Sequence, residues 1–157
     1  MQAGYPIAKL DTSLTKVNET VKENSRLVYD SMLKGLRQAV EHEIKIGIGT
    51  DAAMSYVTHY DMWRELDHHM RQTKLNAGQV IERATKSNAE ILGIDHLTGS
   101  IDIGKQADLI VLEHNPLDNI KALSNVAMVM VRGNLIPIPS VTRIQEVDEL
   151  LDLVWQN

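Results

Sequence analysis

The chain has 157 residues, a formal net charge of -5 and no cysteine, which excludes disulfides and thiolate zinc sites. Its lysines and arginines form no basic block and no apolar run reaches membrane-spanning length, so we expect neither a nucleic-acid partner nor a membrane span. The first residues lack the pattern of a secretory signal, and we therefore expect a cytoplasmic protein large enough to bury a core.

The chain begins with an irregular segment, followed by a helix and a short strand. Residues 1–18 contain Pro6 and few apolar pairs, and we expect them to be irregular. Apolar residues then recur at three- to four-residue steps, which predicts a helix over 19–43. The stripe they form consists of Val21, Val28, Met32, Leu36 and Val40. The β-branched run over Ile44–Gly49 predicts a strand.

Two more helices are predicted after this strand. The first covers about residues 60–72. Its inward-facing residues are expected to be Trp63, Leu66 and Met70. The second begins after Asn76, because Gln79 three residues on completes a capping-box pattern. It runs to about Leu92, where Gly93 is expected to close it.

The pattern changes to that of a β-structure after Gly93. Leu109–Leu112 is a continuous apolar run of strand length. Residues 126–132 and 135–138 predict a hairpin, with the pair Gly133-Asn134 at its turn.

The last part of the chain predicts an amphipathic helix over about residues 141–155. Its apolar side is Ile144, Val147, Leu150, Leu151 and Val154. The chain therefore divides into a helix–strand–helix–helix part, residues 1–94, and a small β part with a helical tail, residues 95–157.

Four segments together resemble the C-terminal part of the metal-dependent amidohydrolase superfamily, with imidazolonepropionase-like and Xaa-Pro-dipeptidase-like members as the nearest in appearance. They are GIGTDAA (47–53), ATKSNAEILGI (84–94), GSIDIGKQADLIVLEHNPLDNI (99–120) and VAMVMVRGNLI (126–136). The resemblance implies an α/β fold: the C-terminal fragment of a (β/α)8 barrel plus part of a small β-sandwich domain. Residues 1–94 would supply the last barrel strand and its flanking helices, and residues 95–157 the strands of the small domain.

The same resemblance gives Asp51 a role. It matches the aspartate that follows the eighth barrel strand, which ligates a divalent metal, usually zinc, and acts as the base of hydrolysis. Barrel enzymes carry their chemistry at this end of the strands. Read without the resemblance, Asp51 is a loop aspartate that caps a turn. His59, eight residues on, matches a position where some relatives contact substrate; the alternative is a surface histidine at a helix start.

The rest of the family's metal site does not occur in this sequence. The family's His-x-His comes from the first barrel strand, a bridging lysine or glutamate from the fourth, and further histidines from the fifth and sixth. No His-x-His occurs among the six histidines, and the adjacent His68 and His69 point about 100° apart on a helix, as its geometry requires. We expect both to lie on a helix face, and His96 and His114 to be structural or solvated. Thr85 and Asn88 are expected to tie down backbone at a helix break.

Two main hypotheses follow. The chain is the C-terminal half of a metal-dependent hydrolase of carbon–nitrogen bonds other than ordinary peptide bonds, inactive and metal-free without the N-terminal half. Alternatively, it is a non-catalytic remnant or self-associating interaction module; a regulatory subunit for a full-length paralogue is a third possibility. Both main hypotheses predict that the chain associates with another polypeptide, either as a homo-oligomer or with the N-terminal half. The reason is that part of a barrel leaves sheet edges and an apolar face uncovered.

Overall fold

The structure, a computed structural model, describes residues 5–10 and 17–155. Its α-helices are α1 (Tyr5–Lys9), α2 (Glu19–Glu41), α3 (Met62–Gln72), α4 (Ala77–Glu82), α5 (Asn88–Ile91) and α6 (Gln145–Trp155). A π-helical turn, Arg83–Ser87, joins α4 to α5, and a 3₁₀ turn, Ile120–Ser124, precedes the second of three strands. The strands are β1 (Leu109–Leu112), β2 (Val126–Val131) and β3 (Asn134–Ile136). Within the described ranges, no helix is long and apolar enough to cross a membrane.

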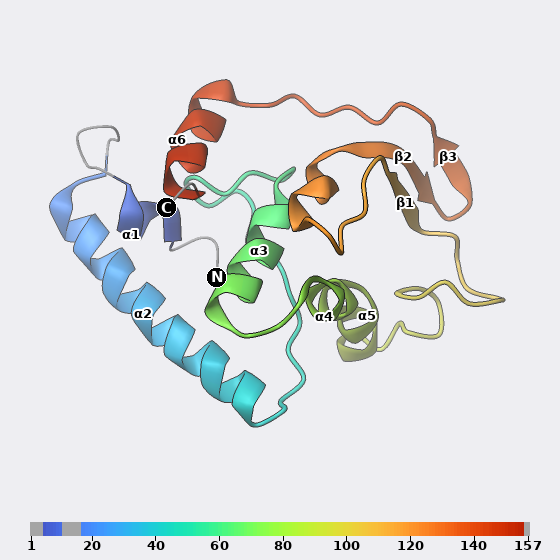
Figure 1. The fold of residues 1–157 in the computed structure, drawn as a ribbon, viewed down its shortest axis with the longest axis horizontal. Helices are drawn as coiled ribbons and strands as arrows, with labels where there is room; N and C mark the ends of the chain where they lie inside the picture. Colours follow the sequence, from blue (N-terminus) through green and yellow to red (C-terminus); the bar gives the residue numbers. More distant parts are fainter. Residues whose placement is uncertain (1–4, 11–16, 156–157) are drawn as a thin grey trace.

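Helix α3 lies at the centre of the molecule, with α2 on one side and the sheet on the other (Figure 1). It contributes to both buried apolar clusters. Trp63 packs with the C-terminal helix in the first cluster, together with Leu10, Leu151, Val154 and Trp155. Leu66 packs in the second, together with Ile48, Ala77, Val80 and Ile120. The inward orientation predicted for the apolar face of this helix is therefore confirmed at Trp63 and Leu66.

The predicted helix over 19–43 is confirmed as α2, but most of its predicted apolar stripe is wrong. Asn18 caps its N-terminus by accepting from the backbone N–H of Val21 at 2.9 Å. The buried residues are instead Tyr29, Leu33 and Leu36. Val21, Val28 and Met32 are exposed. Helices α1 and α3 lie on the Tyr29 side, so the choice of face came from these partners rather than from hydrophobicity alone.

Two further expectations for the N-terminal part need correction. Residues 5–9 form helix α1, where an irregular segment was predicted; residues 1–4 and 11–16 lie outside the described residues. The predicted strand Ile44–Gly49 has neither helix nor strand structure. A strand requires a partner for its backbone groups. In the described parts of the chain no second strand pairs with this segment.

The predicted helix that follows Asn76 is confirmed, including both of its ends. The capping box is complete: Asn76 accepts from the backbone N–H of Gln79, and the Gln79 side chain accepts from the N–H of Asn76. Gly93 follows the last turn with a φ of +69°, the left-handed conformation expected there. The π-helical turn in its middle was not predicted.

The β-hairpin is confirmed, with its turn one residue earlier than predicted. The sheet has the order β1-β2-β3 and is antiparallel throughout. Val131 pairs with Asn134, so Arg132 and Gly133 are the central turn residues, with φ values of 49° and 79°. Several large apolar side chains of the sheet remain exposed: Ile110, Val111, Val131, Leu135 and Ile136.

Helix α6 starts at Gln145, four residues later than predicted, and folds back over α1 and α3 rather than onto the sheet (Figure 1). Leu151 and Val154 are buried as expected, whereas Ile144 is exposed. The observed arrangement is an α/β fold. The assignment to a barrel fragment and a sandwich, and the division near residue 94, stay predictions.

Candidate functional site

Asp51 lies on a turn whose backbone is strained. Its φ is 56°, and Ala53 and Tyr56 also have positive φ values, 83° and 63°. Non-glycine residues rarely adopt this conformation, which costs on the order of 1–3 kcal/mol each and persists only where the surroundings impose it. The turn is closed by backbone hydrogen bonds from Met54 N–H to the Asp51 carbonyl and from Ala53 N–H to the Val57 carbonyl, both 3.3 Å. The Asp51 residue is exposed to solvent.

The segment leading to Asp51 is held by a side chain that takes the place of a neighbouring strand. The Asn88 amide accepts from the backbone N–H of Ile48 at 2.9 Å and donates to the Ile48 carbonyl at 2.8 Å. A Cβ on Gly47 would lie 2.6 Å from the Asn88 amide oxygen, so only glycine leaves room for this clamp. Thr85 donates to the Ile81 carbonyl at 2.7 Å. Thr85 and Asn88 hold backbone groups as predicted, but they do so at a π-helical turn within a continuous helix rather than at a helix break.

His59 lines an open pocket of about 470 Å³ directly after the Asp51 turn. The other lining residues include Ala52, Ala53, Val57, Ile144 and Val147. The His59 ring is exposed and lies edge-on to Tyr60, with 5.1 Å between ring centroids. The structure thus brings His59 and the residues that follow Asp51 to one pocket, but Asp51 itself is not among its lining residues.

The described residues do not by themselves form a metal site. Among them, no group of three or more His, Cys, Asp or Glu side chains is positioned to hold an ion. Tetrahedral zinc sites need three or four protein ligands, and Asp51 supplies one. A metal at Asp51 would therefore require ligands from outside the residues described.

Sequence reasoning missed a cluster of buried charged and polar residues on α3 and at its N-cap. Its members are Asp61, Arg64, Glu65, His68 and His69. Their signal was present in the density of charged and aromatic residues in YDMWRELDHHM (60–70), a helix in which polar residues occupy every face. Such a helix can be buried only where other segments supply hydrogen-bond or charge partners for its polar side chains, and these partners could not be identified from the sequence.

The two adjacent histidines of this cluster do not converge on one ion. His68 Nε2 lies 2.9 Å from the Tyr29 hydroxyl, and His69 Nε2 lies 3.1 Å from a Glu65 carboxylate oxygen. They are on the helix as predicted, but both are buried. Burial lowers the pKa of His68 to about 4 and raises the pKa of Tyr29 well above its ordinary value. The His68–Tyr29 contact packs α3 against α2, whereas His69 and Glu65 pair with each other within α3.

The guanidinium of Arg64 joins α3 to α6. It bonds the Asp61 carboxylate at 3.1 Å and the Asp152 carboxylate, and it lies over the rings of Trp63 and Trp155. A buried cation needs partners of this kind to offset its lost hydration. This part of the cluster is structural as well.

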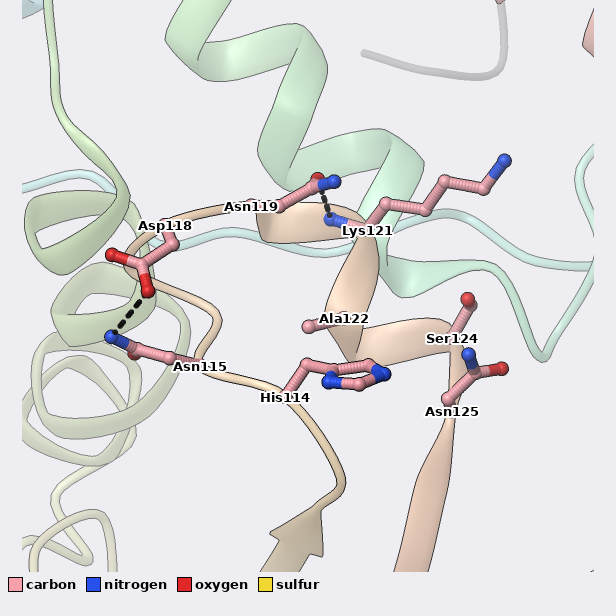
Figure 2. A pocket seen from close by; sticks show the side chains of 8 residues that line it. All are labelled: His114, Asn115, Asp118, Asn119, Lys121, Ala122, Ser124 and Asn125. Atoms are coloured by element: carbon pink, nitrogen blue, oxygen red, sulfur yellow. Dashed lines mark hydrogen bonds between the residues drawn. The ribbon is translucent and has the colours of Figure 1, made fainter.

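Figure 2 shows a second pocket, of about 410 Å³, around His114. Three of its polar side chains form hydrogen bonds within their own loop. Asn115 donates to the Asp118 carboxylate at 3.1 Å, and Asn119 accepts from the backbone N–H of Lys121 at 3.0 Å (Figure 2). His114 is exposed, which agrees with the solvated position expected for it. The pocket beside Asp51 is therefore the better candidate for a functional site.

Several known proteins are similar to this chain in sequence or in structure. Imidazolonepropionase of Thermoplasma acidophilum is 32% identical over 64% of this chain and 25% of its own length. A crystal structure of a Bifidobacterium longum protein provisionally assigned as a prolidase superposes with a TM-score of 0.93, at 39% identity, over 98% of this chain and 38% of the other. A Xaa-Pro dipeptidase with methionine bound in its active site gives a TM-score of 0.73 at 32% identity, over 86% of this chain and 32% of the other.

The chain spans about a quarter of the length of the curated relatives that it matches. The family model described as "Amidohydrolase family" matches residues 4–136, and these include Asp51, His59, Asn88 and the three strands. The resemblance seen in the four sequence segments is thereby confirmed, and the chain belongs to the amidohydrolase family.

Proposed function

We propose that this chain is the C-terminal part of a metal-dependent hydrolase that cleaves carbon–nitrogen bonds other than ordinary peptide bonds. The observation that carries the proposal is Asp51, exposed on a strained turn inside the region that matches the family. Two of the relatives, an imidazolonepropionase and a Xaa-Pro dipeptidase, support the choice of a carbon–nitrogen bond.

In this proposal the Asp51 carboxylate acts first as a general base and then as a general acid. It accepts the proton from a water as that water attacks the amide or cyclic-amide carbonyl, and it returns the proton to the leaving nitrogen as the carbon–nitrogen bond breaks. A divalent metal, zinc in our expectation, would acidify that water when bound. The remaining metal ligands and the substrate loops would come from an N-terminal half, in the same polypeptide or in a separate one. His59 would contact the substrate.

The uncovered apolar surface supports the need for a second segment. Besides the sheet residues already named, Leu27 and Val28 on α2 and Ile103 in the loop before β1 are exposed. Soluble monomers rarely leave large apolar patches uncovered, so these side chains favour a covering partner. We propose that the N-terminal half covers part of them.

A graft tests the proposal. The chain would replace the 38% of the Bifidobacterium longum relative that it matches, and the TM-score of 0.93 over that part is the reason for choosing this relative as host. We expect the graft to bind about one metal ion per chain and to hydrolyse N-acyl or cyclic-amide substrates. Asp51→Asn in the graft should abolish hydrolysis, whereas Asp95→Asn, at an exposed aspartate in the same family region, should leave it unchanged.

A folded graft without metal, or one whose activity survives Asp51→Asn, would overturn the proposal. Elemental analysis and substrate turnover are measured on the same preparation. Circular dichroism establishes that the graft is folded, so that a loss of activity is not read from an unfolded chain.

The exposed apolar residues also favour the second hypothesis, a self-associating module without catalysis. Under it, copies of the chain cover α2 and the sheet of one another. Analytical ultracentrifugation of the chain at micromolar concentration separates the two. A stable homodimer together with an inactive graft supports the module, and a clean monomer counts against it.

A further inference from the structure

The pocket beside Asp51 has an apolar lining without a charged side chain. Apart from His59, its lining consists of small or apolar residues, tyrosine and threonine. The residues from the Asp51 turn are Ala52, Ala53, Met54, Tyr56, Val57 and Thr58. A lining of this kind favours a neutral apolar group over an ion, because an unpaired charge would lose its hydration there.

One buried polar atom of this lining is without a partner. The Thr58 residue is only 6% exposed, and its hydroxyl oxygen makes no hydrogen bond within the described parts of the chain. Buried hydroxyls in folded proteins are usually hydrogen-bonded, and leaving one unpaired costs about 1–3 kcal/mol. This oxygen is itself shielded from solvent, so a ligand in the open pocket does not reach it, and Thr58 supplies no polar contact there.

The opposite wall comes from the C-terminal part of the chain, beyond the residues that match the family. Ile144 and Val147, at the start of α6, complete the pocket, and the family match ends at residue 136. Ile144 is 53% exposed to solvent. Val147 packs partly against the cluster around Trp63. These two side chains form the wall of the pocket on the side of α6.

Hydrogen bonds and an ion pair hold this wall in place. The Tyr60 hydroxyl accepts from the backbone N–H of Ile144 at 2.9 Å and donates to the Asp148 carboxylate at 3.0 Å. Arg143 pairs with Asp148 at 2.8 Å and lies over the Tyr60 ring, 4.6 Å from its centroid. The start of α6 is therefore anchored to the loop that carries His59. These interactions fix the two walls of the pocket relative to each other.

We propose that this pocket receives the apolar acyl or alkyl group of an amide substrate, and that Ile144 and Val147 select its length. The inference rests on the proposed function and names its substrate class. Position supports it, since the pocket begins one residue after Asp51. In this proposal the amide lies at Asp51 and the apolar group next to it enters the pocket.

Binding of neutral amides of increasing chain length tests the inference on the 157-residue chain itself. The probes are N-methylacetamide, N-methylbutanamide and N-methylhexanamide, and the readout is two-dimensional NMR with isotope-labelled protein. We expect shifts at residues 52–59, 144 and 147. Affinity should rise about two- to fourfold per added methylene, since each methylene that leaves water contributes up to about 0.8 kcal/mol.

Two variants sharpen the test. Ile144→Ala should flatten the dependence on chain length. Ile138→Ala is the matched control, the same change at an 84% exposed isoleucine that does not line the pocket. It should change nothing.

Equal affinity for the three probes, shifts confined to other regions, or an unchanged length dependence in Ile144→Ala would each overturn the inference. The NMR spectrum of each variant reports its folding at the same time. Failure of the proposed function is seen separately, because Asp51→Asn should still bind the probes. Probe binding together with an inactive graft would refute the proposed function but not the pocket inference. An active graft together with probe binding that does not depend on chain length would refute the pocket inference but not the function.

Discussion

Asn88 is the side chain on which the position of Asp51 depends most directly. Asn88→Ala removes the two hydrogen bonds to the Ile48 backbone, at 2.9 and 2.8 Å, and a third to the Ala84 carbonyl at 3.2 Å. Ile48 is only 6% exposed, so water does not readily replace the lost partner. The variant should therefore be less stable, and the segment before Asp51 should open more often.

The size of the loss follows from these bonds. Each contributes about 0.5–1.5 kcal/mol net, and an orphaned buried backbone group costs somewhat more, so we expect a loss of about 2–3 kcal/mol. At this chain length that corresponds to a melting temperature about 5–10 °C lower. Asn134→Ala, which removes a single 3.3 Å bond from an exposed hairpin residue, should cost about 0.5 kcal/mol or less.

Urea unfolding measures the global loss, and hydrogen exchange at the Ile48 amide measures the local one. We expect exchange at this amide to accelerate in Asn88→Ala and to stay unchanged in Asn134→Ala. An Asn88→Ala variant with wild-type unfolding and wild-type exchange at Ile48 would show that the clamp is not what positions the segment before Asp51.

Three further changes test other parts of the fold. Leu151→Ala, at a fully buried site in α6, should cost about 2–5 kcal/mol in urea unfolding, and a loss below about 1 kcal/mol would contradict its place in the core. Gly47→Ala should destabilise by about 1–3 kcal/mol, since its Cβ would lie 2.6 Å from the Asn88 amide oxygen, whereas Gly49→Ala, with nothing within 4 Å, should be nearly neutral. Burial lowers the pKa of His68 to about 4 from 6.5, so its stabilising neutral form is fully present above pH 6.5 and is lost as the pH falls towards 4. About 3 kcal/mol should vanish over that interval, and His68→Gln should reduce the slope of stability against pH; an unchanged slope would contradict the assignment.

Local features could be predicted because their determinants lie a few residues apart. The capping box at Asn76 depends on a residue three positions on, and the helix end at Gly93 depends on one left-handed residue. The apolar run of β1 and the hairpin between β2 and β3 belong to the same class. The turn lies one residue earlier than predicted because Arg132 adopts a positive φ, which an arginine in the sequence does not predict.

The candidate site was predictable only as far as its motifs reach. Asp51, His59 and Asn88 were found from short segments that the family match now covers. Ile144 and Val147 were expected to be ordinary helix residues, and Thr58 was not singled out. Nothing near them in the sequence indicates that the start of α6 closes a pocket against residues about 90 positions earlier, because that contact depends on the Tyr60 bridge.

The sequence by itself determined where α2, α3, the helix after Asn76 and the hairpin form, and which aspartate resembles a catalytic one. The tertiary structure decided three other matters. It buried Tyr29 and Leu33 rather than the predicted stripe of α2, left residues 44–49 unpaired, and enclosed Arg64, Glu65 and both histidines of α3. The physical reason is common to all three: periodicity and capping act within one or two turns of chain, whereas burial, strand pairing and charge compensation exist only when distant segments meet.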